Sequence, residues 1–89
     1  MDKVSVKPLD AARFEVTVES HSTTTHIVTV QPDYAAKLSG GKLETSELLR
    51  QSFDFLLERE TNTSILRSFD LSVISRYFPE YESTIRSHL

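Results

Sequence analysis

The chain has 89 residues, no cysteine and a formal net charge of −3 at pH 7. Without cysteine, disulfide bonds, zinc–thiolate centres, iron–sulfur clusters and thiol nucleophiles are excluded. Acidic and basic residues are interspersed, and no basic tract is present to neutralise phosphates, which weighs against nucleic-acid binding. The length predicts one domain over residues 1–89 with a core of modest size.

Hydrophobic segments are short throughout the sequence. No apolar run approaches the roughly 20 residues of a membrane-spanning helix, so no membrane contact is expected. The first ten residues, MDKVSVKPLD, lack the apolar region of a secretory signal peptide. These features, together with the lack of cysteine, favour the cytoplasm as the location.

Strand patterns fill the first third of the chain. Residues 13–19 read RFEVTVE and alternate apolar with polar side chains, which predicts a strand. Residues 25–30, THIVTV, are rich in β-branched side chains and predict a second strand that pairs with the first as a hairpin. Residues 3–7 alternate more weakly, and a short third strand at the sheet edge is the interpretation we give them.

The valines suggest a register for this hairpin. Placing Val16 opposite Val30 brings the valines to one face, and Val18 then lies opposite Val28. The connection falls within residues 21–25. Ile27 is left on the outer, polar face, where an unpaired strand edge nearby would favour a weak homodimer or a partner contact.

The strongest helical pattern covers residues 48–59, and the rest of the fold is organised around it. Its apolar side chains form an arc of roughly 200°, twice the width typical of a surface helix, so we expect contacts on two sides. Thr45 is the expected N-cap. A shorter helix over residues 33–38 precedes it, opened by Pro32 and ended by glycines.

Arg59 stands out because its helical angle falls inside the apolar arc. One interpretation is a fraying last turn whose guanidinium reaches water or binds the last carbonyls. The other, which we carry forward, is a structural ion pair between Arg59 and a carboxylate from another element.

Short helices are predicted for the C-terminal third. They cover residues 64–69, residues 71–77 with Asp70 as the cap, and a last helix that begins at Pro79. The fold class is therefore α+β, with a β-hairpin, extended by the edge strand as an alternative, packed on a central amphipathic helix and closed by short C-terminal helices.

The segments FEVTVE, SFDFLLERE, ILRSFDL and YFPEYE cover much of the chain from Phe14 to Glu82. In these segments the chain resembles a small bacterial protein family without an assigned activity. The resemblance implies a bacterial, cytoplasmic setting and supplies no functional residues.

Motifs of catalysis are weak in this sequence. His21 and His26 bracket the hairpin loop, and we interpret them as a solvated pair rather than metal ligands. No Gly-x-Ser-x-Gly turn is present, and Gly40-Gly41 is no phosphate loop. No enzyme activity and no cofactor are therefore expected.

The expected function is a non-catalytic interaction module, such as an adaptor or regulatory subunit that binds another protein. Its partner surface is predicted at an aromatic and acidic patch that comprises Tyr77, Glu80, Tyr81 and Glu82, and Ile27 on the sheet is a separate predicted contact. The alternative interpretation for the tyrosines is that both close a small core. The alternative function is a nucleic-acid-binding regulator of the antitoxin-like repressor type, with a helix-turn-helix over residues 64–78 and phosphate contacts from Arg67 and Arg76.

Overall fold

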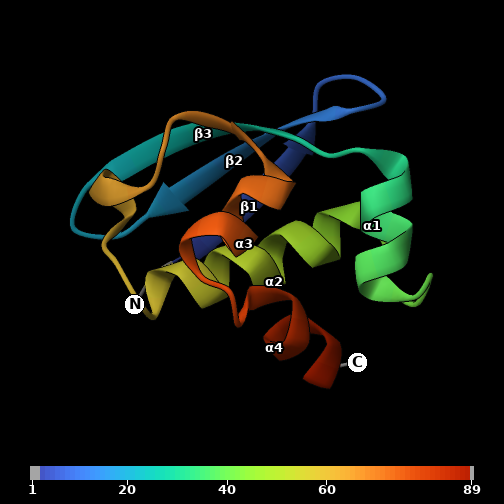
Figure 1. The fold of residues 1–89 in the computed structure, drawn as a ribbon. Helices are drawn as coiled ribbons and strands as arrows, with labels where there is room; N and C mark the ends of the chain where they lie inside the picture. Colours follow the sequence, from blue (N-terminus) through green and yellow to red (C-terminus); the bar gives the residue numbers. More distant parts are fainter. Residues whose placement is uncertain (1–2, 89) are drawn as a thin grey trace.

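The computed structural model describes residues 3–88, which adopt an α+β fold with helices on one face of a mixed sheet (Figure 1). The strands described are β1 (Lys3–Pro8), β2 (Arg13–Glu19), β3 (Thr23–Thr29) and β4 (Ser68–Asp70). The helices described are α1 (Pro32–Ser39), α2 (Thr45–Leu57), α3 (Ile74–Tyr77) and α4 (Tyr81–Ser87), with 3-10 turns η1 (Asn62–Ser64) and η2 (Leu71–Val73).

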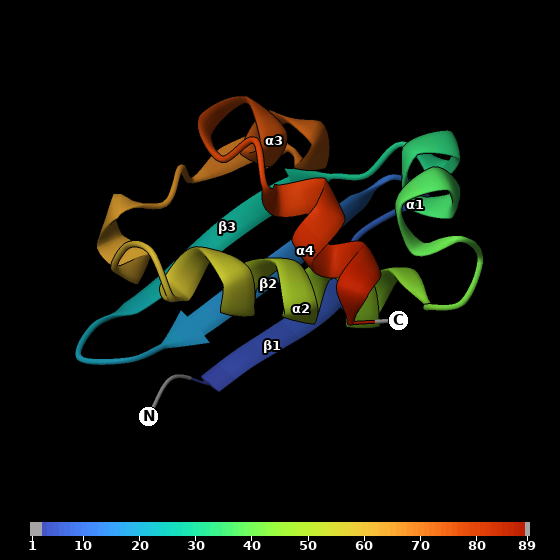
Figure 2. The ribbon, with the colours of Figure 1, turned by 60° about the horizontal axis from the view of Figure 1, so that its bottom comes forward.

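The strands lie in the order β1-β2-β3-β4. The first three pair antiparallel in chain order, and β4 pairs parallel to β3 after the chain has crossed the sheet through α1 and α2. The edge strand expected at residues 3–7 is present as β1, whereas β4 was not predicted. Figure 2 shows α2 and α4 lying across the sheet, with α3 on the β4 side, away from β1.

The predicted hairpin register is wrong. Val16 lies opposite His26 rather than Val30, and Val18 lies opposite Thr24. The cause is a tight connection of three residues, 20–22, in which the Ser20 N–H donates to the Ser22 carbonyl (3.1 Å). The shift is an even number of residues, so the valines keep the face that the sequence predicted for them.

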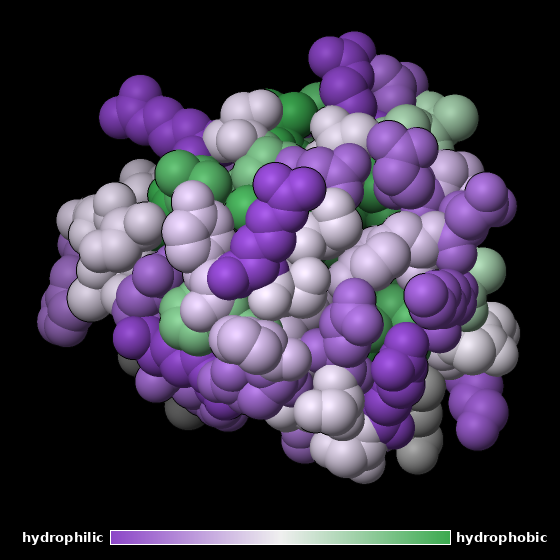
Figure 3. All heavy atoms as spheres, viewed as in Figure 1, coloured by the Kyte–Doolittle hydropathy of each residue, from purple (hydrophilic) through white to green (hydrophobic). Residues whose placement is uncertain are grey.

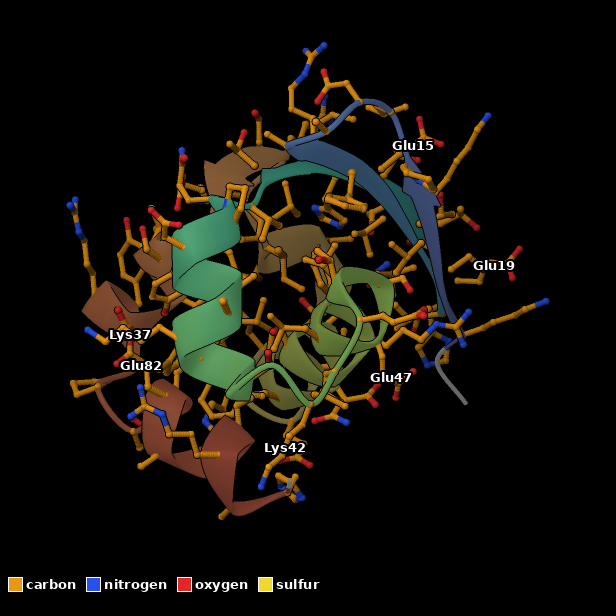
Figure 4. The ribbon with its side chains drawn as sticks, turned by 90° about the vertical axis from the view of Figure 1, so that its right-hand side faces the viewer. Glu15, Glu19, Lys37, Lys42, Glu47 and Glu82 are labelled. Atoms are coloured by element: carbon orange, nitrogen blue, oxygen red, sulfur yellow. The ribbon has the colours of Figure 1, made fainter. Side chains whose placement is uncertain are left out.

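The two faces of the sheet differ in character. The inward side chains of β2 and β3 are buried against the helices, and Val16, Val18 and Val28 are all part of the core. The outward face is polar, and Figure 4 shows Glu15 and Glu19 of β2 pointing away from the helical layer. Ile27 lies on this outer face, as predicted.

Helix α2 begins and ends earlier than predicted. Its N-cap is Glu44, which makes no side-chain cap hydrogen bond, so the prediction of Thr45 as the cap is wrong. The broad apolar arc does bury on two sides. Phe53 packs toward the sheet, with its ring 5.4 Å from that of His26, and Phe55 packs toward α4, with its ring 5.2 Å from that of Tyr81.

The helix predicted over residues 64–69 is absent. This segment forms the end of η1 and then β4, because the free edge of β3 offers backbone hydrogen bonds that the local helical pattern did not reveal. The Ile27 N–H, for instance, donates to the Arg67 carbonyl (2.7 Å). Tertiary pairing here outweighs intrinsic helix propensity.

Other local predictions are confirmed. Gly40 ends α1 in the left-handed region at φ 63°, where a side chain would be strained. Asp70 caps η2 by accepting a hydrogen bond from the Ser72 N–H (3.0 Å). Helix α3 ends at Tyr77, before Phe78 and Pro79.

Candidate functional site: the α3 groove

A groove of about 370 Å³ opens between the C-terminal end of α2, the segment from η1 to β4, and α3. We call it the α3 groove. Figure 3, in the view of Figure 1, shows hydrophobic surface where the segment that includes β4 crosses the molecule. The residues that line it are Leu56, Glu60, Ser64, Ile65, Leu66, Phe69, Val73, Ile74, Tyr77 and Phe78.

The floor of the α3 groove is part of the hydrophobic core. Leu56 of α2, Phe69 of β4 and Ile74 of α3 are all buried, so the floor is fixed by the same packing that holds the domain together. Side chains locked in this way form a preorganised surface.

The rim, in contrast, exposes large side chains. Leu66 is 49% exposed and Tyr77 is 68% exposed. Within residues 3–88 three large hydrophobic residues are exposed to this degree, and the third, Leu9, does not line this groove. Scattered single exposed apolar residues are ordinary, but these two lie beside one apolar groove, which makes the groove the candidate site.

A buried polar chain holds the wall of the groove in place. The Nδ2 of Asn62 donates to the Ser22 carbonyl (2.9 Å) and to Thr24 Oγ1 (3.0 Å). Thr24 Oγ1 lies 2.8 Å from His26 Nε2, and His26 Nδ1 lies 2.8 Å from the Leu66 carbonyl. The chain thus ties residues 62–66 to β3 and to the turn that precedes it.

The tautomer of His26 follows from these contacts. A carbonyl oxygen accepts only, so Nδ1 carries the proton that is donated to Leu66. In the neutral ring Nε2 then accepts from the Thr24 hydroxyl, so both ring nitrogens have partners. His26 is 1% exposed, so the prediction of a solvated histidine pair is wrong, because the actual register brings His26 under the 62–70 segment.

Glu60 introduces charge into this apolar site. Glu60 is half-buried. The Glu60 N–H donates to the Leu56 carbonyl (2.9 Å), and this hydrogen bond holds Glu60 against the end of α2. Burial raises the pKa of the Glu60 carboxyl above its ordinary value. The neighbouring cation, Arg59, points elsewhere.

Arg59 makes both contacts that its sequence position suggested, namely a hydrogen bond to a carbonyl of the last helical turn and an ion pair with a carboxylate from another element. Its Nε donates to Glu80 Oε2 (3.1 Å), across to the start of α4, and its Nη1 donates to the Phe55 carbonyl (3.1 Å). The guanidinium carbon also lies 3.6 Å from the centre of the Phe55 ring. With 26% of its side chain exposed, Arg59 bridges α2 and α4 from the surface.

The predicted partner patch is divided by the fold. Tyr77 is on the rim of the α3 groove, but Tyr81 is 0% exposed, so its assignment to a partner surface is wrong. The Tyr81 hydroxyl lies 2.6 Å from Ser52 Oγ, and burial raises the pKa of the Tyr81 phenol. Its interpretation as a core residue is the one that the structure supports.

The remaining residues predicted to bind a partner make contacts within the molecule. Glu82 accepts a hydrogen bond from the Tyr34 hydroxyl (2.8 Å), and Glu80 pairs with Arg59. Ile27 is half-buried on the outer sheet face, opposite Glu15 on one side and Ser68 on the other. Strand β4 covers the β3 edge that was expected to be free near Ile27.

The helix-turn-helix interpretation of residues 64–78 is also wrong. The segment contains β4 and η2 before the four-residue α3, so no pair of helices is present to place a recognition helix in a groove of DNA. Leu66 and Glu60 were missed as site residues. Leu66 falls within the helix predicted over residues 64–69, and Glu60 follows directly after the predicted central helix.

Comparisons with known proteins add no relative to this picture. No protein-family model, curated protein or solved structure matches the chain. The resemblance to a small bacterial family stays an expectation. Among the helices of residues 3–88, none is long and apolar enough to cross a membrane.

Proposed function

We propose that this protein is a non-catalytic interaction module, such as an adaptor or regulatory subunit, that binds an apolar segment of another protein in the α3 groove. The observation that carries the proposal is the exposure of Leu66 and Tyr77 above a floor made of core residues. Aromatic side chains next to a formed apolar pocket are typical centres of protein interfaces.

The size of the α3 groove fits this role. A volume of about 370 Å³ is at the lower end of the roughly 300–1,000 Å³ typical of small-molecule pockets. One or two side chains of a bound segment would fill it, with Tyr77 and Leu66 closing over them. The polar chain through His26 keeps the wall rigid, which lowers the entropic cost of binding.

The polar groups of the groove favour binding over catalysis. The lining contains one serine, Ser64. Its Oγ lies 3.2 Å from the Thr61 hydroxyl, which is not a general base. Nucleophilic catalysis needs such a base within hydrogen-bonding distance.

A selection from a display library of random linear peptides tests the proposal. The purified protein is the target, and the double variant Leu66→Ser, Tyr77→Ser is the counter-target. We expect peptides with a large apolar or aromatic residue to be enriched on the wild type and lost on the variant. Peptides that bind both proteins equally, or no enrichment, would overturn the proposal.

The oligomeric state decides between a partner segment and a second copy as the occupant. Light scattering over a concentration series should give a monomer for the wild type and for the double variant. A wild-type dimer that the Leu66→Ser, Tyr77→Ser variant loses would instead assign the α3 groove to a homodimer. A dimer lost on Ile27→Ser would place self-association on the outer sheet face.

A further inference from the structure

Charge is distributed unevenly around the α3 groove. Of the lining residues within the described range 3–88, Glu60 alone is charged at neutral pH; the others are apolar or aromatic, apart from Ser64. The carboxylate is therefore half-buried beside apolar side chains, and a half-buried carboxylate is stabilised by a cation.

No such cation is supplied by the described part of the chain. Its salt bridges join Arg13 to Asp10, and Arg59 to Glu58 and Glu80, and leave Glu60 without an ion pair. Arg59, the nearest arginine in sequence, is held away by Glu80 and by the Phe55 ring. Partial burial raises the pKa of the Glu60 carboxyl above its ordinary value.

From this arrangement we infer that the segment bound in the α3 groove carries a lysine or arginine beside its apolar side chain, and that this cation pairs with Glu60. The inference rests on the proposed function, since it names the chemistry of the same partner. An acidic or neutral segment would cover the carboxylate without compensating it, so the groove discriminates against such partners. The net charge of −3 also favours the approach of a basic segment.

The test repeats the peptide selection on three single variants. Glu60→Gln removes the charge with little change of shape, Glu60→Lys reverses it, and Glu19→Gln removes one charge from the outer sheet face (Figure 4). Far-UV circular dichroism and the urea midpoint confirm that each variant is folded, and Glu60 is open enough to solvent for substitutions to be accommodated.

We expect basic residues beside the apolar anchor among peptides selected on the wild type and on Glu19→Gln. Glu60→Gln should retain the apolar anchor and lose the basic preference, and Glu60→Lys should select acidic residues instead. Replacing the basic residue of an enriched peptide by acetyl-lysine should weaken binding to the wild type about fivefold, the size expected for a partly exposed pair. The same replacement should leave binding to Glu60→Gln unchanged.

Two results would overturn the inference in distinguishable ways. Enrichment of apolar anchors without a basic preference, or the same preference on Glu60→Gln, would refute the charge pairing and leave the proposed function standing. Loss of all groove-dependent enrichment would refute the proposed function and the inference together.

Discussion

Tyr77 and Tyr81 lie four residues apart, yet one is 68% exposed and the other 0%. Tyr77 ends α3, and Tyr81 begins α4 after the turn at Phe78 and Pro79. The turn redirects the chain, so the second ring enters the seam between α2 and α4 while the first remains at the rim of the α3 groove. Residue type and sequence neighbourhood alone would have given both tyrosines the same role.

The α2–α4 seam and the α3 groove therefore form a natural comparison. In the seam, the Tyr81 hydroxyl meets Ser52 Oγ, which in turn donates to the Leu48 carbonyl (2.7 Å). Both of these buried hydroxyls therefore have hydrogen-bond partners, as is usual for polar groups in a core. At the α3 groove, in contrast, the side chains of Leu66 and Tyr77 are exposed and the Glu60 carboxylate has no ion pair among the described residues. We therefore interpret the groove as the functional side.

The largest expected effect is on the seam side. Tyr81→Ala should lower the free energy of unfolding by about 3–5 kcal/mol, because it removes a fully buried aromatic ring and leaves a cavity beside Phe55. Tyr81→Phe removes only the hydroxyl and should cost about 1 kcal/mol. Urea denaturation measures both changes. A wild-type midpoint for Tyr81→Ala would remove Tyr81 from the core.

The polar chain behind the groove should give the next effect. His26→Ala removes the donor to the Leu66 carbonyl, leaves the Thr24 hydroxyl with Asn62 alone as a partner, and opens space beside Phe53, at a cost of about 2–4 kcal/mol. His21→Ala, in the exposed hairpin turn, is the matched control and should be neutral. Equal effects of the two substitutions in urea denaturation would contradict the assigned network.

Arg59 should contribute less than either core group. Arg59→Ala removes the stacking on Phe55 and the hydrogen bond to its carbonyl, for a loss of about 1 kcal/mol. Arg50→Ala, on the exposed face of α2, controls for the loss of an arginine. Because Arg59→Lys keeps the charge but not the planar stacking, it should recover only part of the loss. Full recovery in thermal denaturation would assign the effect to charge alone.

The smallest expected effect on stability is at the groove rim. Tyr77→Ala should stay within about 0.5 kcal/mol of the wild type, since its ring is mostly in solvent. Phe78→Ala, one residue on, should cost more because the Phe78 ring packs edge-on against Phe55 at 5.8 Å. If the Tyr77 variant unfolded as readily as the Phe78 variant, the rim would be part of the core.

Local signals in the sequence predicted the elements whose reasons are local. The alternation in residues 13–19, the proline and glycines around α1, and the Asp70 cap all act within a few residues. β4 and the hairpin register were mispredicted for a different reason. They depend on which distant backbone atoms are free to pair, as when the Arg67 carbonyl accepts from the Ile27 N–H.

The candidate site was predictable only in part, for the same physical reason. Tyr77 was found because an aromatic residue before a proline break is visible in the sequence. Glu60 and Leu66 could not be found, because they line one groove with α3 only when β4 joins the sheet. His26 was misassigned because its burial follows from the register and from its hydrogen bond to Leu66.

Chemical-shift mapping by NMR tests the central claim most directly, namely that the α3 groove is the binding surface. The uniformly ¹⁵N-labelled protein is titrated with a peptide enriched in the selection, and backbone amide shifts are followed. We expect the largest shifts at Glu60, Leu66, Phe69 and Tyr77, with the outer sheet face around Thr17 unchanged. Shifts confined to the outer face or to the α2–α4 seam would contradict this account.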